Sequence, residues 1–199
     1  MPMSLPSYEK IMQHARNGAD LKTLALAGVI SEALAAGRRP LIRGLSAALF
    51  QQLVGTYFPG LVLVNDGVEL VDKRLDEFDD LLQMLLDCRV EPGEELAWLS
   101  CAIASAAMAD NHLWQDMGLP NRKVLSDLMA QYFPVLSARN IDDMKWKKFF
   151  YRQLCERAEI PICKSPSCAI CTDYDVCFAA EDGDAKVPAI RVVPLQAIS

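Results

Sequence analysis

The chain has 199 residues and a mass of 22.0 kDa, which suits one domain of ordinary size with a short appendage. Its 20 Lys and Arg against 26 Asp and Glu give a formal net charge of −6, and this acidic balance argues against a general nucleic-acid binder or a polybasic membrane-surface protein. Apolar residues make up 52% of the chain and charged residues 23%, a globular composition able to bury a hydrophobic core.

Nothing in the sequence predicts membrane insertion or export. The longest charge-free apolar stretch, residues 96–109, falls short of the roughly 20 residues that a transmembrane helix needs. No basic segment followed by an apolar leader opens the chain. We therefore expect a soluble, cytoplasmic protein that binds neither membranes nor nucleic acid.

The first part of the chain is predicted to be helical. A weak amphipathic pattern over residues 1–20 indicates a short helix or a loose arm. Apolar residues at helical spacing predict a helix over 21–36, ended by Gly37, and a second from about 43 to 57. Residues 61–68 combine β-branched side chains with an Asn-Asp-Gly turn and predict an extended linker or a minor hairpin.

The clearest periodicity in the chain predicts an amphipathic helix over about 71–88. Its apolar residues recur at steps of four and three: Val71, Leu75, Phe78, Leu82 and Leu85. The next helix should begin at Pro92, because proline suits a first helical turn, and should run to about Asp110. Many alanines and serines in this helix allow close backbone approach, so we expect it to be the most buried.

Two more helices are predicted from capping residues. Asn121 is a favourable N-cap for a helix that Pro134 ends. Asn140, followed three residues later by Asp143, resembles a capping box for a helix to about Arg157.

These patterns together predict an all-α fold, with a single helical domain of about six helices and a C-terminal four-cysteine metal-binding loop. The expected organisation is an N-terminal arm over 1–20, the helical domain over 21–160, the cysteine-rich loop over 161–180 and an irregular tail over 181–199.

The seven cysteines are distributed unevenly along the chain. Three of them, Cys88, Cys101 and Cys155, are scattered at helical positions. The other four are Cys163, Cys168, Cys171 and Cys177, which stand close together among polar turn residues. An odd number of cysteines does not suit a disulfide framework in an intracellular chain. The cluster of four predicts a tetrahedral zinc site or an iron–sulfur cluster.

The spacing C-x4-C-x2-C-x5-C favours an iron–sulfur cluster over zinc. Structural zinc usually takes two knuckles separated by a dozen or more residues, whereas this segment has one C-x2-C and no return segment. A continuous loop suits a cluster, whose several metal atoms each need a sulfur. The first three cysteines also match the start of the plant-type ferredoxin spacing, although the fourth comes too early for that protein. Zinc, disulfides and free thiols remain as alternatives.

Three runs of sequence resemble the NifQ family, the molybdenum-handling proteins of nitrogen fixation. They are NHLWQDMGLPNR (111–122), MKWKKFFYRQLCE (144–156) and CKSPSCAICTDYDVCF (163–178), and the resemblance is sharp over about 96–180. It implies a carrier rather than an enzyme. Such a carrier would bind an iron–sulfur cluster containing molybdenum (Mo-Fe-S) and pass molybdenum to the scaffold and delivery proteins that build the nitrogenase cofactor. The ligands that it implies are Cys163, Cys168, Cys171 and Cys177.

Two residues near these runs are candidates for an extra ligand, or for a group that hydrogen-bonds a ligand. His112 is one, and its alternative role is to cap a helix. Cys155 is the other, and its alternative role is a small buried apolar residue, the role that we also predict for Cys88 and Cys101.

A basic segment precedes the four cysteines. Between Met144 and Arg157 there are five basic residues and one acid. Lys145, Lys147, Lys148 and Arg152 are therefore candidates for attracting an anion such as molybdate, or for docking an acidic partner. The alternative is an ordinary solvated helix face.

The sequence contains no nucleophile elbow, phosphate-binding loop, HExxH pair or dinucleotide fingerprint. We therefore predict a metallocluster carrier and not an enzyme. The alternative function is an interaction module in which a structural zinc ion folds the C-terminal appendage.

Overall fold

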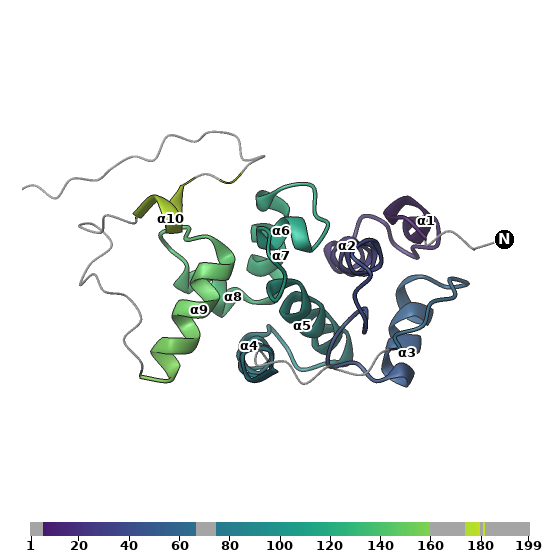
Figure 1. Cartoon of the computed structure of the whole chain (residues 1–199), viewed down its shortest axis with the longest axis horizontal. Coiled ribbons are helices and arrows are strands. Elements are labelled where there is room, and N and C mark those ends of the chain that lie inside the picture. The colour runs from purple at the N-terminus through teal and green to yellow at the C-terminus, as the bar shows by residue number, and fades with distance from the viewer. Residues whose placement is uncertain (1–5, 67–74, 160–173, 180, 182–199) are drawn as a thin grey trace, which may run out of the picture.

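The computed structural model describes residues 6–66, 75–159, 174–179 and 181, and within them it contains ten helices and no strands (Figure 1). None of these helices is long and apolar enough to cross a membrane. The helices are α1 (Tyr8–Met12), α2 (Leu21–Ala35), α3 (Ala47–Tyr57), α4 (Leu75–Cys88), α5 (Glu94–Ala107), α6 (Leu113–Asp116), α7 (Arg122–Tyr132), α8 (Pro134–Arg139), α9 (Trp146–Arg157) and α10 (Tyr174–Phe178).

Helix α5 lies at the centre of the fold, as its small residues predict. It packs against α4 on one side and α2 on the other, and Figure 1 shows it between them. Ala102 and Ala104 are fully buried, because side chains of this size let the neighbouring helices approach closely. The prediction that this helix is a buried element is confirmed.

The backbones of α2 and the α6–α7 connection touch at two glycines. A Cβ atom on Gly28 would lie 2.0 Å from the carbonyl oxygen of Met117, and one on Gly118 would lie 2.7 Å from the Cα of Gly28. Gly118 also has a φ of +60°, a conformation that favours glycine. This contact fixes the short helix α6 against the core.

Gly28→Ala is expected to lower the free energy of unfolding by about 3 kcal/mol, because the added methyl group meets backbone that cannot move aside cheaply. Urea denaturation followed by far-UV circular dichroism measures the change. The matched control is Gly55→Ala in α3, where an added Cβ meets no atom within 4 Å. Since alanine is the better helix former, the control should gain up to about 1 kcal/mol. Equal stabilities of the two variants would contradict the close contact.

Several predicted helix boundaries are confirmed. The N-terminal segment forms a short helix, α1, whose Ile11 is fully buried. Helix α2 ends at Ala35, just before Gly37. At the start of α7, the side-chain oxygen of Asn121 accepts a hydrogen bond of 3.1 Å from the amide of Val124, as an N-cap should.

Other boundaries differ from the prediction. Pro92 is not in the first turn of α5, because Gly93 is the N-cap. Asn140 is not the N-cap of α9 but the C-cap of α8. Its side chain accepts from the Met144 amide and donates to the Met144 carbonyl, both at 2.9 Å, and α9 begins only at Trp146. Pro134 ends α7 but also begins α8, since its fixed φ suits a first helical position.

Residues 61–66 form no strand, so this part fits the predicted linker and not the alternative hairpin, and residues 67 and 68 lie outside the described residues. The segment carries Asn65, which is 7% exposed. Its side chain accepts from the Ile42 amide and donates to the carbonyls of Ile42 and Leu45, each at 3.0 Å. Asn65 therefore fixes the chain between α2 and α3.

Candidate functional site

Of the four clustered cysteines, the described residues include Cys177 alone, which is half-buried on α10. Cys163, Cys168 and Cys171 lie outside the described residues. Within the described part of the chain, no group of three or more His, Cys, Asp or Glu side chains is placed to hold a metal ion. The four-cysteine site therefore stays a prediction, and the structure defines its surroundings at Cys177.

Helix α10 is fixed to the N-terminal end of α9. The amide of Lys145, the N-cap residue of α9, donates a hydrogen bond of 2.9 Å to the carbonyl of Cys177. The Lys145 ammonium lies 3.5 Å from the carbonyl oxygen of Asp175. Figure 1 shows α10 beside this end of α9. Cys177 is therefore held next to the lysine-rich start of α9.

His112 contacts the chain just beyond Cys177. Its Nδ1 atom lies 3.0 Å from Oε1 of Glu181, whose side chain is only 4% exposed. His112 also stands at the N-cap position of α6, where its amide donates to Oε1 of Gln115 at 3.1 Å. The structure thus combines the capping role with a contact to the cysteine-bearing segment. Glu181, assigned from sequence to an irregular tail, is a buried residue of the site.

A buried ion pair joins α6 to α9. Asp116 is 3% exposed, and it accepts hydrogen bonds from the amide and the side chain of Asn111, each at 3.0 Å. Its Oδ2 also lies 2.5 Å from Nζ of Lys147, which donates to the carbonyl of Ala109 at 2.7 Å. Burial lowers the pKa of the Lys147 ammonium, while Asp116 opposes that change. Lys147 is therefore a structural residue as well as a basic one.

A cavity of about 530 Å³ lies where these groups meet, and we call it the lysine pocket. Six of its lining residues are His112, Lys145, Lys147, Lys148, Val176 and Glu181. The first turn of α9 carries no acidic residue and no side-chain cap. Cations at this end of a helix oppose the helix dipole, which prefers acids there. Such a departure from the local preference is typical of functional sites.

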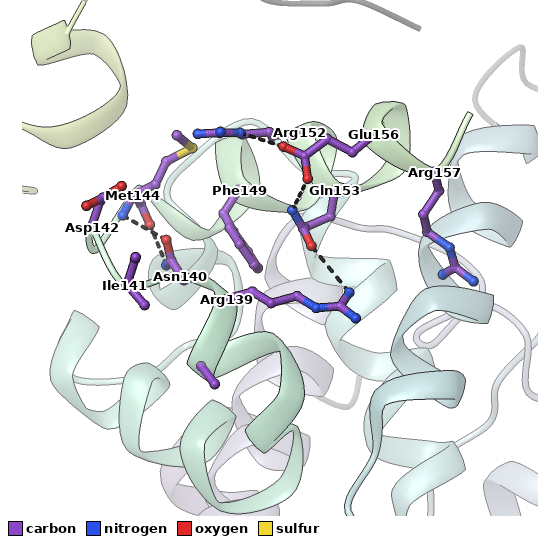
Figure 2. A pocket seen from close by; sticks show the side chains of 11 residues that line it. Arg139, Asn140, Ile141, Asp142, Met144, Phe149, Arg152, Gln153, Glu156 and Arg157 are labelled. Atoms are coloured by element: carbon purple, nitrogen blue, oxygen red, sulfur yellow. Dashed lines mark hydrogen bonds and ion pairs between the residues drawn. The ribbon is translucent and has the colours of Figure 1, made fainter. Parts of the chain in front are cut away.

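The other basic residues of α9 lie in a different place. Arg152 lines a cavity of about 540 Å³ between α8 and α9, together with Arg139 and Arg157 (Figure 2). Arg152 Nε is 2.8 Å from Oε1 of Glu156, and Arg157 Nη2 is 2.6 Å from Oδ2 of Asp87. Arg152 and Arg157 are thus paired with carboxylates, whereas Arg139 donates to the side-chain oxygen of Gln153. The predicted docking set is thus divided, with the three lysines beside α10 and Arg152 in the second cavity.

The three cysteines outside the cluster have ordinary surroundings. Cys88 and Cys101 are 7% and 6% exposed, which confirms that they belong to the core. Burial raises the pKa of the Cys101 thiol to about 11, and it also raises that of Cys88. Cys155 is half-buried on α9 and lines neither cavity, so its role as an extra ligand stays a prediction.

Cys88→Ala and Cys101→Ala are each expected to lower the free energy of unfolding by about 1 kcal/mol through lost packing, with the metal content unchanged. Both wild-type thiols should also resist alkylation at about pH 8, because they are buried and protonated. Denaturation curves, metal analysis and mass spectrometry after iodoacetamide treatment check this. Loss of metal at an equal folded fraction would overturn the assignment of these residues to the core.

Comparison with known proteins identifies relatives across most of the chain. The family model described as NifQ matches residues 25–179. A protein named Protein NifQ from Azotobacter vinelandii is 37% identical over 155 residues, which cover 71% of this chain and 80% of that protein. Protein NifQ from Rhodobacter capsulatus is 37% identical over 163 residues, covering 79% of this chain and 89% of that protein. No solved structure matches the chain.

Proposed function

Because the chain belongs to the NifQ family, which gives it a role in nitrogen fixation, we propose that it is a molybdenum carrier for assembly of the nitrogenase iron–molybdenum cofactor. Its cargo is an iron–sulfur cluster containing molybdenum, held by Cys163, Cys168, Cys171 and Cys177. It receives molybdenum from molybdate or another source, passes it to cofactor scaffold and delivery proteins in the cytoplasm, and is not itself an enzyme.

The observation that carries the proposal is the position of α10. Its Cys177 is half-buried, and the backbone carbonyl of this residue is fixed by the amide of Lys145. A carrier needs a ligand that is held in place yet open to an exchange partner, and this arrangement supplies both. Thiolates are soft ligands that suit iron–sulfur clusters, so the donor type fits the cargo.

The charges around α10 also support an anionic cargo. Four thiolate ligands bring four negative charges to the metal, and nearby groups tune the net charge that a cluster can carry. Lys145 and Lys148 line the pocket beside α10, at the end of α9 where the helix dipole is positive. Positive charge at this position stabilises negative charge on the cargo and on an incoming oxyanion.

Metal analysis of protein purified without oxygen tests the proposal. We expect a brown protein that contains iron, sulfide and molybdenum, with a cluster signal in electron paramagnetic resonance. A colourless protein that contains zinc alone would overturn the proposal and favour the interaction module with a structural zinc site. Protein without any bound metal after anaerobic reconstitution with iron, sulfide and molybdate would overturn both.

Lys145→Gln combined with Lys148→Gln is expected to slow molybdenum loading several-fold at low salt, because steering of an anion is electrostatic. The difference should vanish well above roughly 0.15 M salt, where the Debye length is about 8 Å. Lys147 is left in place because its ammonium is bound to Asp116. Lys10→Gln with Lys123→Gln removes the same charge elsewhere and should change nothing. Equal rates for both double variants at all salt concentrations would exclude steering by these lysines.

A further inference from the structure

A third basic cavity, of about 370 Å³, lies between the α2–α3 connection and the C-terminal end of α5. We call it the arginine pocket, because Arg38, Arg39 and Arg43 all line it. None of these arginines lines the lysine pocket. The two cavities share Asp110 and Asn111, so they lie on either side of the loop before α6.

The backbone that carries the three arginines is firmly held. Leu41 and Ile42, which lie between Arg39 and Arg43, are 2% and 0% exposed. Asn65 binds the backbone of Ile42 with two hydrogen bonds. The amide of Arg43 donates to Oγ of Ser105 on α5 at 2.9 Å. The arginine side chains therefore extend from fixed positions, which lowers the entropy cost of ordering them around a ligand.

The positive charge in the arginine pocket is incompletely neutralised. Arg39 Nε lies 3.3 Å from Oδ1 of Asp66, but both side chains are well exposed, and such pairs are weak. Among the residues that the structure describes, neither Arg38 nor Arg43 forms an ion pair. The Asp116 carboxylate at the pocket is already bound to Asn111 and Lys147.

Arg38 lies close enough to Lys147 to affect the pKa of its ammonium group. Burial is the main cause of the lowered pKa of Lys147; Asp116 and Asp110 oppose the change, and the Arg38 guanidinium makes the smallest contribution in the direction of burial. An anion in the arginine pocket would relieve this repulsion.

We propose that the arginine pocket binds a tetrahedral divalent oxyanion. Molybdate, sulfate and phosphate share this chemistry. A guanidinium presents a planar pair of N–H donors that matches two oxygens of such an anion, and hydrogen bonds of this charge-assisted kind are among the strongest in proteins. The oxyanion proposal does not depend on the cysteine site. If molybdate is the preferred anion, molybdenum reaches the carrier as molybdate.

A purely structural role for the arginines is the rival explanation. Helices α2 and α5 both end near this cavity, at Ala35 and Ala107, and cations complement the negative C-terminal end of a helix. That explanation predicts a loss of stability when the arginines are removed, with no effect on any anion. The two explanations are therefore separated by measuring binding and stability on the same variants.

Binding of radiolabelled molybdate to the full-length, metal-free chain tests the proposal by equilibrium dialysis at low salt. The variant Arg38→Gln with Arg43→Gln should bind at least about tenfold more weakly, since each lost charge-assisted contact is worth that much. The matched control, Arg16→Gln with Arg89→Gln, removes the same charge elsewhere and should bind as the wild type does. Lys145→Gln with Lys148→Gln should also keep the affinity, which separates this site from the lysine pocket.

The outcomes are distinct. A variant with alanine at all four clustered cysteines should keep the wild-type affinity for molybdate. The oxyanion proposal can therefore hold even if the carrier proposal fails. If unlabelled molybdate displaces the label but sulfate and phosphate do not, the pocket is selective for molybdate as the molybdenum source. If all three anions displace it equally, the pocket is a general oxyanion site. The proposal is overturned if Arg38→Gln with Arg43→Gln binds molybdate as tightly as the wild type does. It is also overturned if the wild type shows no saturable binding of molybdate.

Discussion

Replacement of Cys163, Cys168, Cys171 or Cys177 by alanine, one at a time, is expected to remove most of the bound iron and molybdenum. A cluster held by four thiolates loses one metal–sulfur bond in each variant, and the exposed corner becomes open to solvent and to oxidation. The far-UV circular dichroism should stay near that of the wild type. The reason is that α10, the element that carries Cys177, has five residues and packs only partly buried side chains, Cys177 and Phe178, against the core.

Iron, molybdenum and sulfide are measured per folded chain after anaerobic purification. Cys155→Ala is the matched control, since Cys155 is half-buried on α9 and belongs to no predicted C-x4-C-x2-C-x5-C position. Loss of metal from this control would show that a fifth sulfur contributes. A variant of the four that kept its full iron and molybdenum content would exclude that cysteine from the ligand set.

The helices of the core were predictable because their apolar residues repeat over several turns. The pattern that ends with Phe78, Leu82 and Leu85 produces α4, whose Phe78 is 2% exposed. The small residues of α5 likewise predict its central place. These signals come from periodic burial, which a sequence displays directly.

Helix starts were less predictable, because more than one local structure suits the same residues. Asn140 has the side chain of a good N-cap, but it hydrogen-bonds the backbone of Met144 instead and closes a loop. Pro134 was expected only to end a helix, yet it also begins one. The short helices α6 and α8 span too few residues to show an apolar period at all.

The surroundings of the candidate site depended on tertiary contacts that no local pattern shows. Lys147 belongs to a basic run and resembles a solvated residue, but its side chain is only 17% exposed because Asp116 accepts its ammonium. Asp116 comes from a short helix that the sequence did not predict. Glu181 stands in a segment without periodicity, and its contact with His112 follows from where α10 is placed.

Asp116→Ala is expected to lower the free energy of unfolding by about 3 to 5 kcal/mol, the largest stability effect of any variant proposed for this chain. The Asp116 carboxylate is 4% exposed, and its removal leaves the Lys147 ammonium buried without a counter-charge. It also removes the acceptor of both Asn111 hydrogen bonds. The change is measured from chemical denaturation, with Asp127→Ala as the control. Asp127 forms an exposed pair with Lys123 on α7, so the control should change stability by about 0.5 kcal/mol or less.

A double-mutant cycle shows whether the lost stability belongs to the ion pair. Lys147→Met alone should be strongly destabilising, because it leaves the Asp116 carboxylate buried with only Asn111 as a partner. Asp116→Ala with Lys147→Met leaves neither charge buried, so the double variant should be more stable than the sum of the single effects predicts, by about 1 kcal/mol or more. Additive effects would show that the two residues stabilise the fold independently. Because this pair joins α6 to α9, and Asp116 also binds Asn111, it fixes the loop that separates the lysine pocket from the arginine pocket. The double variant should therefore keep its helical content while both anion-dependent measurements, molybdenum loading and oxyanion binding, become weaker together.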